Sequence, residues 1–385
     1  MIRRPAFAGE GIELRRDRDR RSGWVLLAMT VATVAGVFLA LYAFYAPSIG
    51  FDVSLVAAAA RSGMAGGTLY SDPTGALFGA ESPHFYGPPA LALAYVPLSL
   101  LPDGAVVRVA LLLGYAIALA SLALLVVPVR RAVGRSGRAS LLVGVLLGYA
   151  FLGAASLGNP SILVLLGIAV AFVGIERDEP WLVGLGLGTA AAFRLYPLLL
   201  LVPLAVSGRW RAIVASLAVV AAWTAAGMAV FGIDDTVRYV GIAAAIAAPH
   251  GAEDITINAA LPAIAARAGA SELAQTALRV ASVALGAAAL LAGGSLLRGA
   301  AAERRLLGLG IAAAGMLLIP SAIWDHYLTA VLVLVVGIVA ATRRARWGLL
   351  SAGLLPASIG GGLALVWLPV LAVAAGRVGR DRRQA

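Results

Sequence analysis

Long uninterrupted apolar runs constrain this chain more than any other feature of its sequence. Residues 24–46 and 104–128 are both long enough to cross a bilayer, which takes roughly 20 helical residues. Apolar residues make up 61% of the chain and charged residues only 13%, against about 45–50% and about 25% in a soluble domain. This excludes a soluble enzyme, a disordered chain and a disulfide scaffold, and predicts an all-α, polytopic transmembrane helix bundle.

The charge balance is strongly basic, because the chain carries 30 basic residues and a net charge of +11. All of the basic residues are arginine, and there is no cysteine to support disulfides or thiolate chemistry. Cytoplasmic loops of membrane proteins collect arginine and lysine. We therefore attribute the positive charge to membrane topology and expect no nucleic-acid partner.

The apolar runs predict about twelve spans, with both chain ends on the same side of the membrane. The predicted spans are 24–46, 104–128, 139–157, 161–175, two short ones within 181–206, 213–231, 276–297, 306–319, 327–342, 348–361 and 363–376. Basic tails at 1–23 and 377–385 flank this single membrane domain, 24–376. Two polar loops, at about 47–103 and 232–275, lie on the side away from the tails.

Arginine positions support this layout, because most of them fall in the tails and in the short loops on the side of the tails. We therefore expect a multi-pass membrane protein with both termini in the cytoplasm, and the lysine-free, Ala/Gly/Arg-rich composition suggests a bacterial plasma membrane. The arginines on the other side are Arg61, Arg108, Arg194, Arg238, Arg267 and Arg279. The apolar stretch 88–101 is too short for a span and is expected to be re-entrant or interfacial. The side of the membrane that carries both long loops, where we expect the functional site, is then extracytoplasmic.

Asp52 opens an expected helix just after the first span, with Val53, Val56 and Ala60 on its apolar face. One interpretation makes Asp52 a helix N-cap, because its carboxylate can accept hydrogen bonds from the first backbone N–H groups. The other makes it a general base held at the membrane surface, where acidic groups are costly and often functional. The residue alone does not decide between the two.

Polar residues elsewhere on the same side suggest contacts to an anionic or sugar-bearing substrate. His84 and Tyr86 precede the apolar stretch 88–101, where His84 is titratable and Tyr86 could equally be an interface anchor. Arg194 stands among apolar residues, either reaching the surface at a hairpin tip or binding an anion such as phosphate. Other candidates are Asp325 and His326 in a turn between spans, and Asn258 and Arg267 in the second long loop.

These motifs, in this order, resemble glycosyltransferase family 87, whose members use polyprenyl phosphate sugars. The resemblance covers about residues 50 to 330 and rests on "FDVSLVAAAARSG", "GGTLYSD", "FYGPPALALAYVPLSLLP", "GNPSILVLL", "GLGLGTAAAFRLYPLLLLVPL", "NAALPAIAAR" and "PSAIWDHYLTAVL". It implies a GT-C architecture with interfacial helices in the long first outer loop, and Asp52 as the catalytic residue. It places Asn159 where the family often has Gln and Arg194 where it often has Lys, and it matches Trp324, Asp325 and His326 to a Trp-Asp-His element.

The resemblance also implies the reaction. A mannosyl or arabinofuranosyl group would pass from a polyprenyl phosphate carrier to a glycolipid or cell-wall glycan. The phosphate is already a good leaving group, so one base with cations at the departing phosphate is sufficient. We expect no cofactor and no obligatory metal, because the first loop lacks an Asp-x-Asp pair. The alternative is a secondary transporter or lipid flippase, which predicts symmetric halves, whereas the long first loop has no counterpart in the second half.

Overall fold

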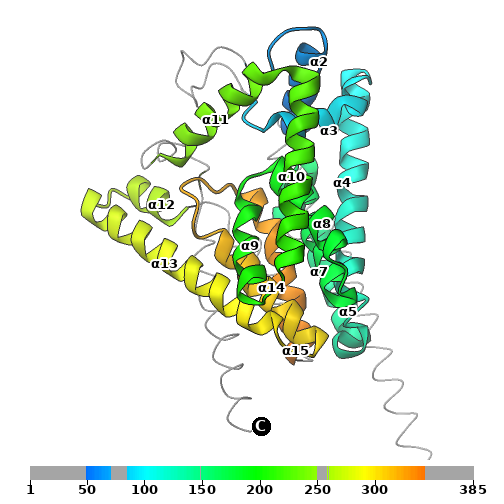
Figure 1. The fold of residues 1–385 in the computed structure, drawn as a ribbon, viewed down its shortest axis with the longest axis vertical. Coiled ribbons are helices and arrows are strands. Elements are labelled where there is room, and N and C mark those ends of the chain that lie inside the picture. Colours follow the sequence, from blue (N-terminus) through cyan, green and yellow to red (C-terminus); the bar gives the residue numbers. More distant parts are fainter. Residues whose placement is uncertain (1–48, 71–84, 148, 249–257, 259, 343–385) are drawn as a thin grey trace, which may run out of the picture. The chain divides into compact units, whose positions relative to one another are not determined.

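The computed structural model describes residues 49–70, 85–147, 149–248, 258 and 260–342. The basic tails, the spans expected at 24–46, 348–361 and 363–376, and His84 lie outside these residues. Every regular element within the described ranges is helical (Figure 1), and one isolated antiparallel bridge joins Asn258 to Trp324. The all-α prediction is therefore confirmed for the described part of the chain.

Three helices of the described part are long and apolar enough to cross a membrane: α4 (Asp103–Val126), α10 (Trp210–Phe231) and α13 (Glu272–Leu297). They match the spans predicted at 104–128, 213–231 and 276–297. Large apolar side chains on these helices, among them Leu112, Val214 and Val280, are exposed. An apolar exterior on long helices is what a lipid-facing surface requires.

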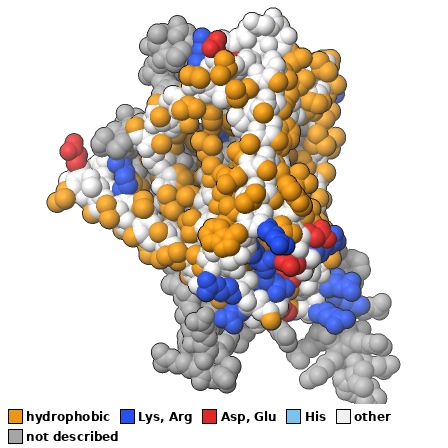
Figure 2. Space-filling model, viewed as in Figure 1, with side chains coloured by type: hydrophobic (Ala, Val, Ile, Leu, Met, Phe, Trp, Pro, Cys, Tyr) orange, Lys and Arg blue, Asp and Glu red, His pale blue; other side chains and the backbone are white. Residues whose placement is uncertain are grey.

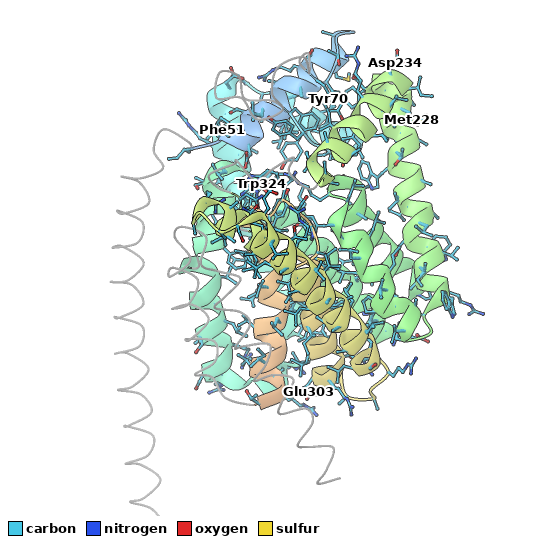
Figure 3. The ribbon with its side chains drawn as sticks, turned by 90° about the vertical axis from the view of Figure 1, so that its left-hand side faces the viewer. Phe51, Tyr70, Met228, Asp234, Glu303 and Trp324 are labelled. Carbon is cyan, nitrogen blue, oxygen red and sulfur yellow. The ribbon has the colours of Figure 1, made fainter. Side chains whose placement is uncertain are left out.

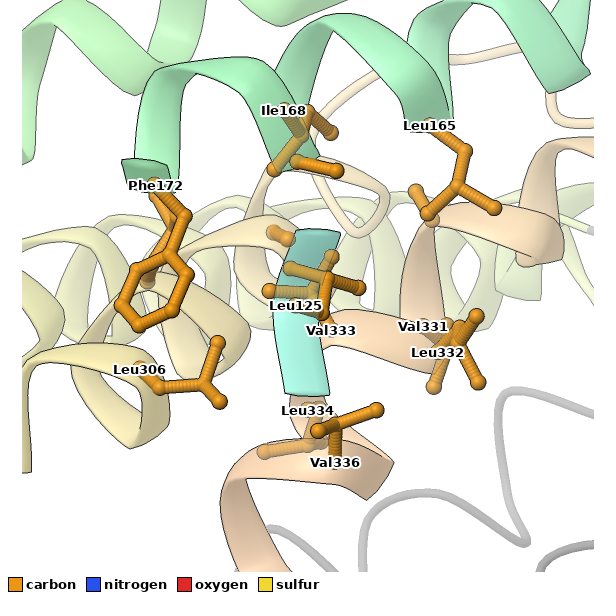
Figure 4. Packing of buried hydrophobic residues seen from close by; sticks show 14 of the residues in the cluster. Leu125, Leu165, Ile168, Phe172, Leu306, Val331, Leu332, Val333, Leu334 and Val336 are labelled. Atoms are coloured by element: carbon orange, nitrogen blue, oxygen red, sulfur yellow. The ribbon is translucent and has the colours of Figure 1, made fainter. Parts of the chain in front are cut away.

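Shorter helices form the core of the fold between these long ones. They are α7 (Ser161–Arg177), α8 (Pro180–Phe193), α9 (Leu201–Val206), α14 (Ala302–Met316) and α15 (Leu332–Thr342). Leu125 of α4 packs with side chains of α7, α14 and α15 in the main buried cluster (Figure 4). The apolar run 139–157, expected as one span, is helical wherever it is described, as part of α5 (Arg130–Leu147) and as α6 (Tyr149–Leu157), with residue 148 outside the described ranges.

Glycines allow α7 and α8 to approach each other closely. A Cβ atom placed on Gly167 would lie 2.5 Å from the carbonyl oxygen of Gly186, so neither position has room for a side chain. Small residues at such crossings let helix backbones meet in van der Waals contact. The glycines at this crossing therefore act as helix-packing residues.

A layer of helices covers one end of the core, and we refer to α2, α3 and α11 together as the upper layer (Figure 1). Its members are α2 (Phe51–Met64), α3 (Pro89–Ser99) and α11 (Ile233–Ala247). They share a second buried cluster with the start of α4 and the end of α8. The 11 residues of α3 are too few to span a bilayer, as the sequence predicted. Asp103 pairs with Arg61 at 2.7 Å and so ties α4 to α2.

The opposite end of the core carries most of the basic side chains visible in Figure 2, near α5 and the connection between α13 and α14. Arg305 at the start of α14 forms a bidentate pair with Glu176 at the end of α7, with both N–O distances 2.6 Å. Arg209, before α10, contacts Asp178 at 3.2 Å. The described arginines are thus unevenly distributed between the two ends, as the positive-inside rule requires of a membrane protein.

Candidate active site

Asp52 lies in the first turn of α2, where the chain enters the upper layer. Gly50 is the N-cap of this helix, in a left-handed conformation (φ 76°), and no side chain caps the helix. The N-cap interpretation of Asp52 is therefore wrong, although a carboxylate in the first turn still favours the helix dipole. Val53, Val56 and Ala60 are buried as predicted. They fix α2 against its neighbours, and the Asp52 carboxylate accepts a hydrogen bond from another element instead of capping its own.

That hydrogen bond comes from Asn159, in the turn between α6 and α7. Gly158 ends α6 with φ 66°, a conformation that favours glycine, and the chain turns here between the spans predicted at 139–157 and 161–175. The side chain of Asn159 is buried, and its Nδ2 lies 2.6 Å from Oδ2 of Asp52 and 2.9 Å from Nε2 of His326. Its Oδ1 accepts from Ser161, through the backbone N–H at 2.9 Å and the hydroxyl at 2.6 Å. Asn159 therefore connects Asp52 to His326.

His326 lies on the short 3-10 helix η3 (Asp325–Val331), which leads into α15. The ring of Trp324 is nearly parallel to the imidazole, with 4° between the planes and centroids 6.4 Å apart. Tyr327 meets the same imidazole edge-on, with centroids at 5.1 Å. Figure 3 shows Trp324 between the upper layer, where Phe51 and Tyr70 are labelled, and Glu303 at the opposite end. His326 is thus held by aromatic neighbours on the side of the core that faces the upper layer.

Asn258 fixes the strand-like segment that carries Trp324. Its side-chain Nδ2 donates to the carbonyl of Ser321 at 3.0 Å, and its Oδ1 accepts from the backbone N–H of Ile323 at 3.1 Å. Arg267, at the end of α12 (Leu261–Arg267), donates to the carbonyl of Asn258 at 2.7 Å. The structure therefore places these two predicted site residues behind the Trp324–His326 segment, where they support it.

Arg194 ends α8 and turns its guanidinium into the fold. Its backbone is extended (φ −150°, ψ 131°), so the helix stops at Phe193 and the chain resumes as the 3-10 helix η2 (Tyr196–Leu200). The guanidinium lies over the ring of Tyr327, 5.4 Å from its centroid. Its Nε is buried and has no hydrogen-bond partner among the described residues. A buried donor of this kind is costly unless an acceptor occupies the site.

Four tyrosines from four different elements surround Arg194: Tyr95 of α3, Tyr196 of η2, Tyr239 of α11 and Tyr327 of η3. Each is close enough to interact electrostatically with the guanidinium. Tyr196 and Tyr327 also stack on each other, with ring centroids 4.9 Å apart. Sequence reasoning missed all four, because they are scattered over the chain. The available signals were that Tyr196 follows Arg194 by two positions and that Tyr327 directly follows His326.

The two titratable groups beside Asn159 have pKa values that are shifted in opposite directions by their surroundings. Burial raises the pKa of Asp52, while the Asn159 hydrogen bond and the charge of Arg194 oppose this rise. Burial, with the nearby Arg194 cation, holds the pKa of His326 well below its ordinary value. The imidazole is therefore neutral at physiological pH, while burial makes the Asp52 carboxylate more basic than an exposed one.

The remaining predicted site residues lie elsewhere. Tyr86 is half-buried and packs on the cluster beneath the upper layer, where burial raises its pKa. His84 and the side chain of Asp325 lie outside what the structure describes. Within the described ranges, no three His, Asp or Glu side chains are placed to share a metal ion. The structure thus brings together Asp52, Asn159, Arg194 and His326 from the predicted set.

Comparison with known proteins identifies the family. The model for glycosyltransferase family 87 matches residues 85–321, which is more than half of the chain. The matched range contains Asn159 and Arg194, while Asp52 lies well before its start and His326 lies just after its end. No curated protein and no solved structure matches the chain. Because the family model covers most of the described helices, the chain belongs to glycosyltransferase family 87.

Proposed function

We propose that this protein transfers a sugar from a polyprenyl phosphate carrier to a glycolipid or cell-wall glycan at the outer face of a bacterial plasma membrane. A mannosyl group is the first candidate and an arabinofuranosyl group the second. The observation that carries the proposal is one carboxylate, Asp52, and one guanidinium, Arg194, near a common centre formed with His326. A base and an anion-binding cation are the two groups that transfer from a lipid phosphate needs.

In the proposed reaction, Asp52 removes the proton of the acceptor hydroxyl as that oxygen attacks the anomeric carbon. The new bond joins the acceptor oxygen to the anomeric carbon, and the bond from this carbon to the phosphate oxygen breaks. The polyprenyl phosphate leaves with the electron pair, and the proton remains on Asp52. A single displacement of this kind inverts the anomeric configuration. No covalent enzyme intermediate is needed, so one carboxylate is sufficient.

Arg194 is the proposed contact for the departing phosphate. A guanidinium presents a planar set of donors that suits phosphate oxygens, and its unpartnered Nε supplies a donor for such an oxygen. His326 contributes as a neutral hydrogen-bonding group and not as a second cation, because its pKa is lowered. The positive charge at the site therefore comes from Arg194.

The proposed orientation puts the upper layer at the extracytoplasmic surface and both termini in the cytoplasm. The concentration of arginine at the opposite end of the core supports this orientation. A donor carried on a membrane lipid reaches such a site from the bilayer, so a soluble nucleotide-sugar domain is not needed. The partners are then the lipid-linked donor, a glycolipid or glycan acceptor, and bulk membrane lipids.

The test is transfer by the purified full chain in lipid nanodiscs, supplied with radiolabelled polyprenyl phosphate mannose or arabinofuranose and candidate acceptors. The proposal predicts labelled product together with stoichiometric release of polyprenyl phosphate. A flippase or transporter would instead move the labelled lipid across proteoliposomes without breaking the sugar–phosphate bond. Lipid movement with no bond cleavage, for any of these donors, would contradict the proposed reaction.

A further inference from the structure

Two donors on Ser161 fix the orientation of the Asn159 side-chain amide. The backbone N–H of Ser161 is only able to donate, and it lies 2.9 Å from Oδ1 of Asn159, while the Ser161 hydroxyl lies 2.6 Å from the same oxygen. The oxygen of the amide must therefore face Ser161. The nitrogen then faces the opposite way, towards Asp52 and His326, which agrees with the ionised carboxylate being an acceptor.

This orientation determines the proton on His326. The amide nitrogen has two N–H groups, one directed to Oδ2 of Asp52 at 2.6 Å and the other to Nε2 of His326 at 2.9 Å. A nitrogen that receives an N–H bond carries a free lone pair, so Nε2 is unprotonated and the neutral imidazole has its proton on Nδ1. All donors and acceptors of this buried amide are then satisfied.

We propose that Asn159 is a positioning residue, oriented by Ser161, that aims the carboxylate of Asp52 and fixes His326 as the tautomer with Nε2 unprotonated. This inference deepens the proposed function and depends on Asp52 being the base. By holding Oδ2, Asn159 leaves Oδ1 of Asp52 for the acceptor hydroxyl. By holding Nε2, it leaves Nδ1–H as the donor of His326. One amide thereby sets the roles of two groups that come from α2 and η3.

The direct test measures the tautomer and needs no substrate. The full chain, labelled with ¹⁵N-histidine in lipid nanodiscs, contains only three histidines, and His326→Gln assigns the signal of interest. The wild-type spectrum should show His326 neutral with an unprotonated Nε2. Asn159→Asp is the matched variant, because it keeps the side-chain shape and the acceptor for Ser161 but removes both donors. In that variant His326 should carry a proton on Nε2, which would bond to the new carboxylate.

Kinetics provide the second readout. With two carboxylates adjacent, one of them binds a proton more tightly, so Asn159→Asp should shift the acidic limb of the pH–rate profile to higher pH. We expect kcat to fall about 10–100-fold, as for loss of a positioned base, with the donor KM within about twofold of wild type. Ser161→Ala removes one of two donors and should show a smaller change in the same direction. Ser121→Ala, a buried serine in the interior of α4, should match wild type.

A protonated Nε2 in wild type, or an unchanged tautomer and pH profile in folded Asn159→Asp, would overturn the assignment. If Asn159→Asp unfolds, the wild-type spectrum and Ser161→Ala still decide the question. A wild-type chain with the expected tautomer but no transfer activity would contradict the proposed function and leave the orientation of Asn159 standing. The two failures are therefore distinguishable.

Discussion

The amide of Asn159 donates to the carboxylate of Asp52 at 2.6 Å, although 107 residues separate them in the chain. This contact joins α2, in the upper layer, to the turn that begins α7 in the core. Since the same amide reaches His326 on η3, three distant segments converge on one buried side chain.

The first prediction concerns pH. Burial raises the pKa of Asp52 above its ordinary value of 3.8, and only the deprotonated carboxylate is able to act as the base. Activity should therefore be lost as the pH falls through this raised pKa, at a pH higher than an exposed aspartate would give. The measurement is kcat/KM against pH at saturating acceptor. A profile that stays flat down to pH values near 4 would argue against a buried Asp52 as the base.

The second prediction concerns Arg194. Arg194→Ala removes the buried cation, and loss of charge-assisted hydrogen bonds costs about 1.5–3 kcal/mol each, so the donor KM should rise about tenfold or more. Arg194→Lys should keep part of the affinity, because it retains the charge but not the planar donor set. Arg209→Ala, which alters a half-buried arginine at the opposite end that pairs with Asp178, is the control. Donor KM values that are equal in all four proteins would mean that Arg194 does not contact the donor.

The third prediction concerns the crossing of α7 and α8. A methyl group on Gly186 would overlap the backbone of α7 at Gly167 and Ala171. Overpacking of this kind costs about 1–3 kcal/mol, so Gly186→Ala should lower the thermal unfolding midpoint. Gly241→Ala is the control, because Gly241 is an exposed helical position of α11 with open space around it. It should leave the midpoint unchanged or raise it slightly. Equal midpoints in the two variants would contradict the close packing of these helices.

The fourth prediction concerns the segment that follows α2. Asp235 of α11 is buried and accepts from the hydroxyl of Thr68 at 2.7 Å and from the backbone N–H of Leu69 at 2.9 Å. Asp235→Ala leaves both donors unpaired, which costs about 1–3 kcal/mol, and should increase amide hydrogen exchange at Leu69. Asp235→Asn retains one acceptor and should have an intermediate effect. Unchanged exchange in both variants would show that this contact does not hold the segment.

Much of the fold could be predicted, because the length of an apolar run and the position of a glycine turn are determined by residues that are close in the sequence. The helices at 104–128, 213–231 and 276–297 were expected within a few residues, and so was the turn at 158–160, where Gly158 ends α6. The start of α5 at Arg130, before the predicted span 139–157, was missed, because the prediction followed apolar run length and residues 130–138 are largely polar. A short helix within 88–101 was expected from the length of that apolar stretch, and α3 occupies Pro89–Ser99.

The candidate site was predictable only in part. A charged residue or a histidine among apolar residues stands out in the sequence, because placing it in a membrane costs free energy. Asp52, Arg194 and His326 could be selected as candidates on this ground. Tyr95 and Tyr239 could not, because tyrosines near a membrane surface are common anchors and only tertiary packing brings these two to Arg194. The N-cap interpretation of Asp52 failed for a local reason, since Gly50 begins the helix two residues earlier.

The central claim is that Asp52 is the general base, and Asp52→Asn tests it most directly. The substitution keeps the side-chain shape and an oxygen that is able to accept from Asn159, but removes the basic carboxylate. Transfer from a synthetic polyprenyl phosphate sugar by the purified variant should fall at least ~10²-fold. Donor binding and the thermal midpoint should stay near wild type, because the base contacts the acceptor. A folded Asp52→Asn protein with wild-type turnover would contradict the account.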